Sequence, residues 1–225
     1  MTLAQLQNNG KPAVWTRIKP MIRMLRRFLA TPGMIGSITP SSPALAKAMT
    51  RQIGQGVAVF EIGAGTGVIT RCIQKTALSG PLVIFEQDHL MAEHLRHRSG
   101  QAKVVEGFFH DTVGGLGEIP DPLVILSSVP FKSLPEGLHA NTVDAICHIL
   151  LASPNRRLIQ YTYFDHPPFI AQDRNLHWRR LTRVWANLPP ATVWELRRET
   201  GAVQKKPANT RYAPINGIQE LHALS

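Results

Sequence analysis

The stretch Val59-Phe60-Glu61-Ile62-Gly63-Ala64-Gly65-Thr66-Gly67 decides the fold of this 225-residue chain. An apolar run ends in an acidic residue, three alternating glycines follow, and an amphipathic run over 68–76 begins at once. This order predicts a buried strand, a tight turn and a helix. Glycine lets the backbone turn sharply and lets a ligand approach with no Cβ in the way. Nucleotide-binding α/β proteins hold their ligand at such a turn, where the helix begins.

The acidic residue in front of this turn narrows the class of ligand. Glu61 would repel phosphates but suits a ligand with a cationic part. A second acid, Glu86, ends the next apolar run, 23 residues after Gly63, where a carboxylate can accept hydrogen bonds from both ribose hydroxyls. S-adenosylmethionine has a ribose, an ammonium group and a sulfonium, and it has no phosphate. The residues therefore predict a site for S-adenosylmethionine.

Apolar and amphipathic runs alternate along the rest of the chain. We expect strands at 57–62, 82–85, 103–106, 123–128, 157–163, 181–188 and 192–197, and helices at 43–52, 68–76, 88–98 and 135–151. The alternation predicts an α/β fold with a doubly wound, mostly parallel seven-stranded sheet of the Rossmann-like kind. The two consecutive strands at the end predict a C-terminal antiparallel hairpin.

Basic residues gather in the first 60 residues, which contain no Asp or Glu and carry +8 of the formal net charge of +10. Residues 11–30 form an amphipathic pattern, with apolar residues at spacings of three and four and cations mostly off that stripe. A helix of this kind is typical of proteins that lie on a membrane surface. Two other interpretations stay open: a helix packed on the domain with a solvated basic face, and a helix that binds nucleic acid. The docking residues on the first interpretation are Trp15, Lys19, Arg23, Arg26 and Arg27.

No apolar run approaches the roughly 20 residues that span a bilayer, and no secretory apolar region follows the basic N-terminus. We therefore expect a cytoplasmic protein, peripheral on the inner face of the cytoplasmic membrane. The two cysteines, Cys72 and Cys147, match no metal-binding spacing, so we expect no metal site.

The run E-x-G-x-G-x-G at residues 61–67 resembles the first motif of the class I S-adenosylmethionine-dependent methyltransferases. By that resemblance, Glu61 organises the turn near the methionine ammonium, and Glu86 holds the ribose diol with Gln87 beside the adenine. The same resemblance implies that the cofactor is lined by Gly63, Ala64, Gly65, Gly67 and Ser127. Phe108 stands where the family often has an Asp next to the adenine amino group. Either Asp111 takes that role, or the adenine is held by stacking alone.

The segment Ser128-Val129-Pro130-Phe131 follows the fourth predicted strand. It is similar to the N/D/S-x-P-Y/F motif of N-methyltransferases that act on nucleic acid bases. In those enzymes a polar side chain and a backbone carbonyl accept hydrogens from the attacking nitrogen, and the aromatic ring packs on the acceptor. The alternative for this chain is an ordinary exit from a strand.

Several blocks together resemble the bacterial phospholipid N-methyltransferases, which act on phosphatidylethanolamine. The blocks are 28–46, 59–67, 127–131, 160–163 and 184–191. The resemblance implies a docking segment at 1–38, a methyltransferase domain at 39–200 and a tail at 201–225, with an anionic membrane and a phospholipid as partners.

The resemblance implies that the protein methylates phosphatidylethanolamine and its methylated forms towards phosphatidylcholine. We take Ser128, Tyr163 and His166 as candidates to orient the amine or accept its proton. Arg180 or Arg183 would meet the lipid phosphate, because Arg suits bidentate phosphate contacts.

Three alternatives remain. The first is an RNA or DNA adenine N-methyltransferase, although these usually have Asn in place of Ser128 and a separate base-binding domain for which we expect this chain to be too short. The second is a methyltransferase with another acceptor. The third is a non-enzymatic membrane-surface protein with a degenerate cofactor pocket.

Overall fold

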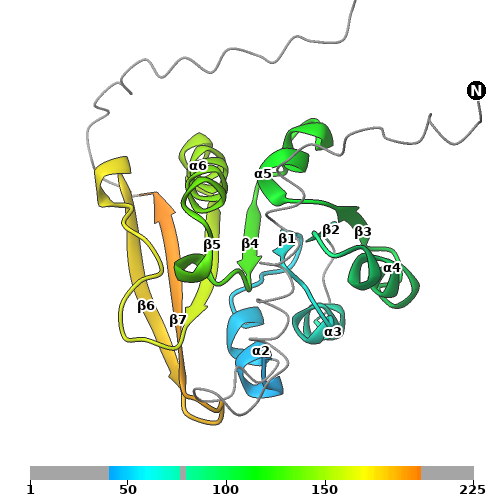
Figure 1. The fold of residues 1–225 in the computed structure, drawn as a ribbon, viewed down its shortest axis with the longest axis horizontal. Coiled ribbons are helices and arrows are strands. Elements are labelled where there is room, and N and C mark those ends of the chain that lie inside the picture. The colour runs from blue at the N-terminus through cyan, green and yellow to red at the C-terminus, as the bar shows by residue number, and fades with distance from the viewer. Residues whose placement is uncertain (1–40, 77–79, 199–225) are drawn as a thin grey trace, which may run out of the picture.

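The structure is a computed structural model, and it describes residues 41–76 and 80–198. The predicted basic helix, the docking residues Trp15, Lys19, Arg23, Arg26 and Arg27, and the tail at 201–225 lie outside the described residues. The described part forms one seven-stranded sheet with helices on both faces (Figure 1).

The sheet has the strand order β3-β2-β1-β4-β5-β7-β6. Its strands are β1 Ala58–Ile62, β2 Leu82–Glu86, β3 Lys103–Glu106, β4 Leu123–Ser127, β5 Arg156–Thr162, β6 Leu176–Val184 and β7 Ala191–Arg198. The first five strands are parallel, and β7 lies antiparallel between β5 and β6. The predicted doubly wound sheet with a C-terminal antiparallel hairpin is therefore confirmed.

The helices are α2 Pro43–Thr50, α3 Val68–Lys75, α4 His89–Arg98, α5 Phe109–Thr112 and α6 Glu136–Ala152. Short 3-10 helices lie at Val113–Leu116, Phe131–Ser133 and Gln172–Arg174. Figure 1 shows α5 and α6 on one side of the sheet and α2 and α3 on the other. The central strands β1 and β4 are buried along their whole length, because helices cover both faces.

Each face of the sheet has its own apolar core. Under α5 and α6, the ring of Phe85 makes edge contacts with Phe60 and Phe109, with centroids 5.5 and 4.9 Å apart. On the other face, Met49 of α2 and Ile73 of α3 lie in the second core. Apolar burial on both faces is what holds the strands and helices together.

The edge strand β6 differs from the prediction, which placed a strand at 181–188. The strand runs from Leu176 to Val184, and residues 185–190 form the turn to β7. A register shift between Arg180 and Thr182 breaks the regular alternation of side chains, as a β-bulge does. The apolar run after Val184 resembled a continuing strand in sequence, but it belongs to an exposed turn.

Two segments remote in sequence meet where α2 begins. Ser42 is the N-cap of α2, and its hydroxyl accepts a hydrogen bond from Leu45 N at 3.2 Å. The backbone N–H of Ser42 donates to Oδ1 of Asn187, 145 residues away, at 3.1 Å. Nδ2 of Asn187 donates to the Pro189 carbonyl at 2.8 Å. Asn187 therefore ties the start of α2 to the β6–β7 turn.

Among residues 41–76 and 80–198, no helix combines the length and apolar character needed to cross a membrane. In the same part of the chain, no group of three or more His, Cys, Asp or Glu side chains could hold a metal ion.

Candidate cofactor and acceptor site

The carboxyl ends of the parallel strands meet at one edge of the sheet. Ile62 of β1 is in register with Phe85 of β2 and with Ser127 of β4, which is in register with Gln160 of β5. The segments that follow these strands therefore gather at this edge, where α/β proteins bind their ligands. We call it the carboxyl edge.

The glycine-rich turn after β1 depends on a backbone conformation that side chains disfavour. Gly63, Gly65 and Gly67 have φ angles of 72°, 54° and 73°. Gly67 is the N-cap of α3, so the turn delivers the chain directly into the helix. At Gly63 an added Cβ would lie 3.5 Å from Cγ2 of Val129, so this turn contacts the loop after β4. At Gly65 an added Cβ would meet nothing within 4 Å, which leaves open space in front of the turn.

Glu86 links the end of β2 to this turn. Its Oε2 accepts a hydrogen bond from Gly65 N at 2.8 Å, and its Oε1 accepts one from Asp88 N at 2.9 Å. Burial raises the pKa of Glu86, and these backbone hydrogen bonds oppose the rise. Each carboxylate oxygen has more than one acceptor position, so both can still accept a hydrogen bond from a ligand hydroxyl.

Glu61 lies beneath the turn and is 0% exposed. Its Oε2 accepts a hydrogen bond from the Thr70 hydroxyl of α3 at 2.7 Å. Its Oε1 is buried and has no hydrogen-bond partner among the described residues. Burial raises the pKa of Glu61 to about 7, although the Thr70 bond lowers it. A buried carboxylate with an unpaired oxygen fits a cationic ligand, because a nearby positive charge would stabilise its ionised form.

The predicted adenine region lies beside Glu86. Glu86 and Glu106 are in register, and Gly107 N donates to the Glu86 carbonyl at 3.0 Å. Phe108 is half-buried just before α5, and its ring stacks on His110 with centroids 5.7 Å apart. The exposed Asp111 has its Oδ1 3.4 Å from Nε2 of His110. Phe108 therefore follows the residue that is bonded to Glu86, one face of its ring is stacked on His110, and Asp111 is turned to His110.

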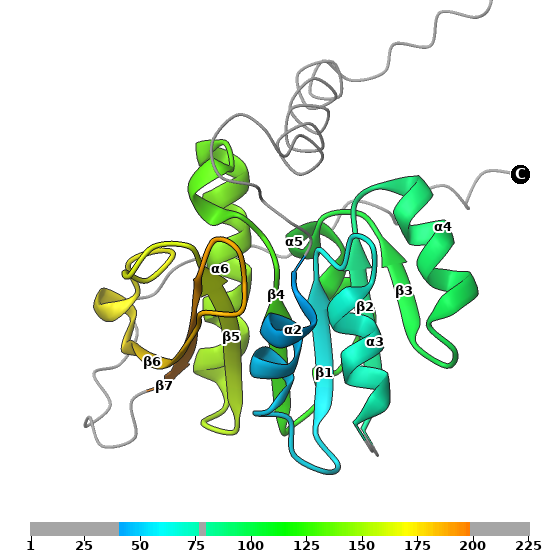
Figure 2. The same ribbon diagram turned by 90° about the horizontal axis from the view of Figure 1, so that it is seen from below.

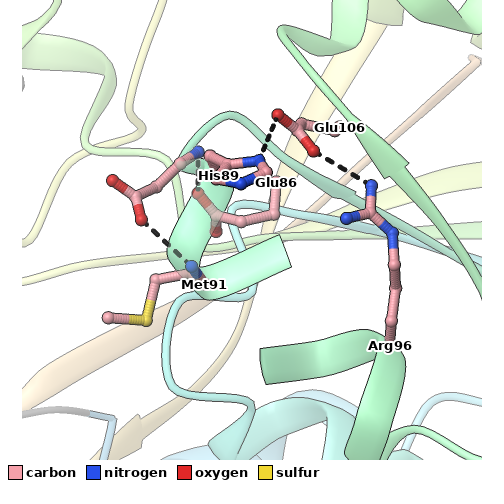
Figure 3. A network of polar contacts seen from close by, with 6 residues as sticks. Glu86, His89, Met91, Arg96 and Glu106 are labelled. Atoms are coloured by element: carbon pink, nitrogen blue, oxygen red, sulfur yellow. Dashed lines mark hydrogen bonds and ion pairs between the residues drawn. The ribbon is translucent and has the colours of Figure 1, made fainter. Parts of the chain in front are cut away.

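A polar network fixes the start of α4 next to this region (Figure 3). Glu106 contacts Nδ1 of His89 at 3.0 Å and Nη2 of Arg96 at 3.1 Å, and these partners, Arg96 foremost, lower its pKa. The Asp88 side chain caps the helix by accepting from Met91 N at 3.0 Å. The half-buried Gln87 precedes this cap. The contacts fix the direction in which the chain leaves Glu86.

Buried polar groups hold the loop after β4. Ser128 N donates to the Ile62 carbonyl at 3.0 Å. Val129 N donates to the hydroxyl of buried Ser127 at 3.2 Å, and the Val129 carbonyl accepts from Nε2 of buried Gln160 at 3.1 Å. The backbone of residues 128 and 129 is thus clamped between β1, β4 and β5. Ser128 is brought to the carboxyl edge next to the glycine-rich turn.

The aromatic residue of the loop is placed differently from the motif resemblance. Phe131 is only 2% exposed, and its ring packs edge-on against Phe169 with centroids 5.0 Å apart. The ring is part of the core under α6, whereas the resemblance places it against the acceptor. Its contribution here is to anchor the loop.

Tyr163 and His166 both follow β5. Tyr163 packs against the core on the α2 face, and burial raises the pKa of its hydroxyl, so the phenol stays protonated at neutral pH. His166 is exposed, and its Nε2 lies 2.7 Å from Nζ of Lys132, the residue after Phe131. His166 is thus placed beside the acceptor loop, and Tyr163 can orient a group but not act as an ionised base.

Arg180 and Arg183 converge on one carboxylate. Nη1 of Arg180 lies 3.2 Å from Asp165, and Nη1 of Arg183 lies 3.8 Å from the same side chain. The two guanidinium groups thus surround a single acid in the loop after β5. Arg180 and Arg183, the predicted phosphate contacts, therefore lie close to each other and are both paired with Asp165.

Sequence reasoning did not single out three polar residues of this site: Thr70, Lys132 and Gln160. Gln160 alone had a local signal, since it is a polar residue inside the apolar stretch of β5. The other two are recognisable only from their partners.

Comparison with known proteins supports the fold. No family model matches the chain, and no curated protein matches it in sequence. Among solved structures, a TehB-like S-adenosylmethionine-dependent methyltransferase from Corynebacterium glutamicum is similar, with a TM-score of 0.52 and 15% identity over 82% of this chain and 100% of that one. A mitomycin 7-O-methyltransferase is similar with a TM-score of 0.50 and 16% identity, over 85% of this chain and 62% of the other. The chain therefore has the fold of the class I S-adenosylmethionine-dependent methyltransferases.

Proposed function

We propose that the protein is an S-adenosylmethionine-dependent N-methyltransferase that methylates the headgroup amine of phosphatidylethanolamine at a membrane surface. The observation that carries this proposal is the contact between two segments: the glycine-rich turn of Gly63 and the acceptor loop of Val129. A methyl donor on the turn and an amine on the loop would be neighbours in one site, and proximity supplies much of the catalysis of a transfer reaction.

The polar groups around the turn support the choice of cofactor. Glu86 would accept the ribose hydroxyls, and the unpaired Oε1 of Glu61 would face the cationic part of the ligand. The face of the Phe108 ring that is not stacked on His110 would hold the adenine. S-adenosylmethionine, when bound, supplies a methyl group activated by a positively charged sulfur.

The acceptor nitrogen must be neutral before it forms a bond to the methyl carbon. The headgroup ammonium therefore has to lose a proton first. Ser128 would orient the amine, and the proton would pass to water; His166 could accept it only after its Nε2 parts from Nζ of Lys132, because its Nδ1 faces the Pro167 carbonyl. Tyr163 would act only as a hydrogen-bond donor, because burial keeps its hydroxyl protonated.

One feature favours a phospholipid over a nucleic acid base, and two more suit any anionic, phosphate-bearing partner. The blocks around Ser42 and Asn187, which resemble the phospholipid enzymes, are bonded to each other. Arg180 and Arg183 lie together, as a phosphate contact would require. The stretch 1–60 contains no acid and eight cations, which suits an anionic membrane on the cytoplasmic side.

The deciding experiment compares acceptors. The full chain is incubated with methyl-labelled S-adenosylmethionine and with either phosphatidylethanolamine vesicles containing an anionic lipid or total RNA. We expect label in the lipid and none in the RNA. Label in RNA alone would favour the adenine N-methyltransferase, and cofactor binding without transfer to either would leave a different acceptor.

The predicted docking segment is tested separately. Replacing Arg23, Arg26 and Arg27 together by Glu in the full chain should weaken co-sedimentation with anionic vesicles, since each cation near such a surface contributes about 1 kcal/mol. Cofactor binding should not change. Equal co-sedimentation of both proteins would contradict a docking role for this segment.

A further inference from the structure

Three large apolar side chains project from two loops of the described chain. Trp185 and Leu188, both 74% exposed, lie in the β6–β7 turn, and Phe164, 58% exposed, follows β5. Exposed aromatic and aliphatic side chains that gather on loops commonly mark contact sites for a partner.

These two loops lie at the carboxyl edge of the sheet. Thr162 at the end of β5 is in register with Thr192 of β7, which is in register with Arg183 of β6. The β6–β7 turn therefore projects on the same side as the end of β5. Figure 2 shows this turn and the glycine-rich turn after β1 at the same edge of the sheet. The apolar side chains thus lie on loops at the edge of the sheet that also carries Ser128.

The turn is built to hold its apolar side chains outward. Asn187 is buried, and its amide bonds to Ser42 N and to the Pro189 carbonyl. The guanidinium of Arg183 lies over the ring of Trp185, 4.8 Å from its centroid. The hydrogen bonds of Asn187 and the stacking of Arg183 limit the conformations of the turn. Less conformational entropy is therefore lost when the turn binds a partner.

Cations lie directly behind the apolar tips. Arg180 and Arg183 share a single carboxylate, Asp165, and Nζ of Lys132 is 4.9 Å from the ring centroid of Phe164. An apolar tip backed by cations suits a lipid surface, where the tips enter the acyl boundary and the cations stay among the phosphates. A stable protein interface buries about 800 Å² on each partner, which favours a broad face over separate loop tips.

We propose that Phe164, Trp185 and Leu188 form an insertion edge, a membrane contact separate from the predicted N-terminal docking segment. The choice of a lipid partner rests on the proposed function. The insertion edge would orient the carboxyl edge of the sheet towards the bilayer. A headgroup amine could then reach Ser128 without the lipid leaving the membrane.

The test uses the double variant Trp185→Ser/Leu188→Ser of the full chain. Its partition into vesicles of phosphatidylethanolamine and phosphatidylglycerol should fall at least about tenfold, because two large apolar side chains no longer leave water. A control variant, Leu151→Ser/Ile170→Ser, replaces two exposed apolar residues elsewhere, one at the end of α6 and one farther along the loop after β5. The control should partition like the wild type, and both variants should bind S-adenosylmethionine as before.

Equal partition of the double variant and the control would overturn the insertion edge. So would a lipid-free dimer, seen by sedimentation, that only the double variant abolishes, since the face would then serve self-association. Trp185→Phe gives a second readout: it should keep vesicle binding and lose a tryptophan signal that brominated lipids quench. If no quenched signal is lost, Trp185 does not enter the bilayer.

Methyl transfer distinguishes this proposal from the proposed function. If the wild type methylates no lipid but the partition difference persists, the function fails and the insertion edge stands. If lipid is methylated while partition is unaffected by the double variant, the function stands and the edge fails. If both stand, the double variant should lose activity on vesicles and keep it on short-chain phosphatidylethanolamine in solution.

Discussion

Replacing Glu61 by Gln should make the protein more stable at alkaline pH and weaken its binding of a cationic cofactor. The carboxyl group is fully buried, and its pKa is raised by burial from 4.5 to about 7. Gln cannot ionise, and its carbonyl oxygen can still accept the hydrogen bond that the Thr70 hydroxyl donates to Glu61. The substitution therefore removes the buried charge with little change in shape.

The magnitude follows from the two pKa values. Between pH 4.5 and about 7 the unfolded chain loses the Glu61 proton while the folded chain keeps it, so the free energy of unfolding falls as pH rises through this window. At about 1.4 kcal/mol per pH unit, the total loss is about 3 kcal/mol, and it is complete above the folded-state pKa. The Gln variant should match the wild type near pH 4.5 and exceed its stability by about 3 kcal/mol at pH 8.

Urea unfolding of both proteins at several pH values between about 4.5 and 8 measures this effect. The difference between the two proteins isolates Glu61, because every other ionisable side chain is common to both. Calorimetry should show weaker binding of S-adenosylmethionine to the Gln variant, which lacks the counter-charge. A stability difference that does not change with pH would refute the reasoning, since it would mean that Glu61 is ionised without penalty.

Three further substitutions test the site. Glu86→Gln should weaken S-adenosylmethionine binding at least about tenfold in calorimetry. The amide NH₂ of Gln would face the backbone N–H of Gly65 or that of Asp88, so that two donors would oppose each other. Unchanged affinity would contradict a ribose-binding role. Gln160→Leu should release the Val129 carbonyl and lower kcat roughly tenfold with the KM for the cofactor unchanged, and a rise in that KM alone would argue against a positioning role on the acceptor side. Asn187→Ala should lower the free energy of unfolding by about 2 kcal/mol in urea titrations, since it removes two partly buried hydrogen bonds, and a change below about 0.5 kcal/mol would show that the tie to α2 is dispensable.

Much of the fold was predictable because its signals are local. The strands β1 and β4 appear in the sequence as short apolar runs, because helices cover both of their faces. The glycine-rich turn was predictable because positions with positive φ angles, as its three glycines have, favour glycine. Ser42 caps α2 directly before Pro43, as a serine ahead of a proline in the first helical turn commonly does. A capping side chain, a turn residue and an apolar run each act within a few positions along the chain.

The strand β6 was predicted with the wrong bounds and the short helix α5 was not predicted, because nearby residues do not determine them. The edge strand β6 carries a bulge and exposed charges, so its sequence lacks the alternation of a regular strand. The short helix α5 spans only Phe109–Thr112. One turn of helix leaves too few residues for a helical period to be recognised.

The sequence by itself determined the sheet, the cofactor turn and the acids at the ends of β1 and β2. Only the tertiary structure decided that Asn187 reaches Ser42, that Arg180 and Arg183 share Asp165, and that one oxygen of Glu61 stays unpaired. The physical reason is how far apart along the chain the interacting residues lie. Backbone conformation follows largely from neighbouring residues, whereas burial and hydrogen-bond partners depend on segments that lie far apart along the chain and meet only when it folds.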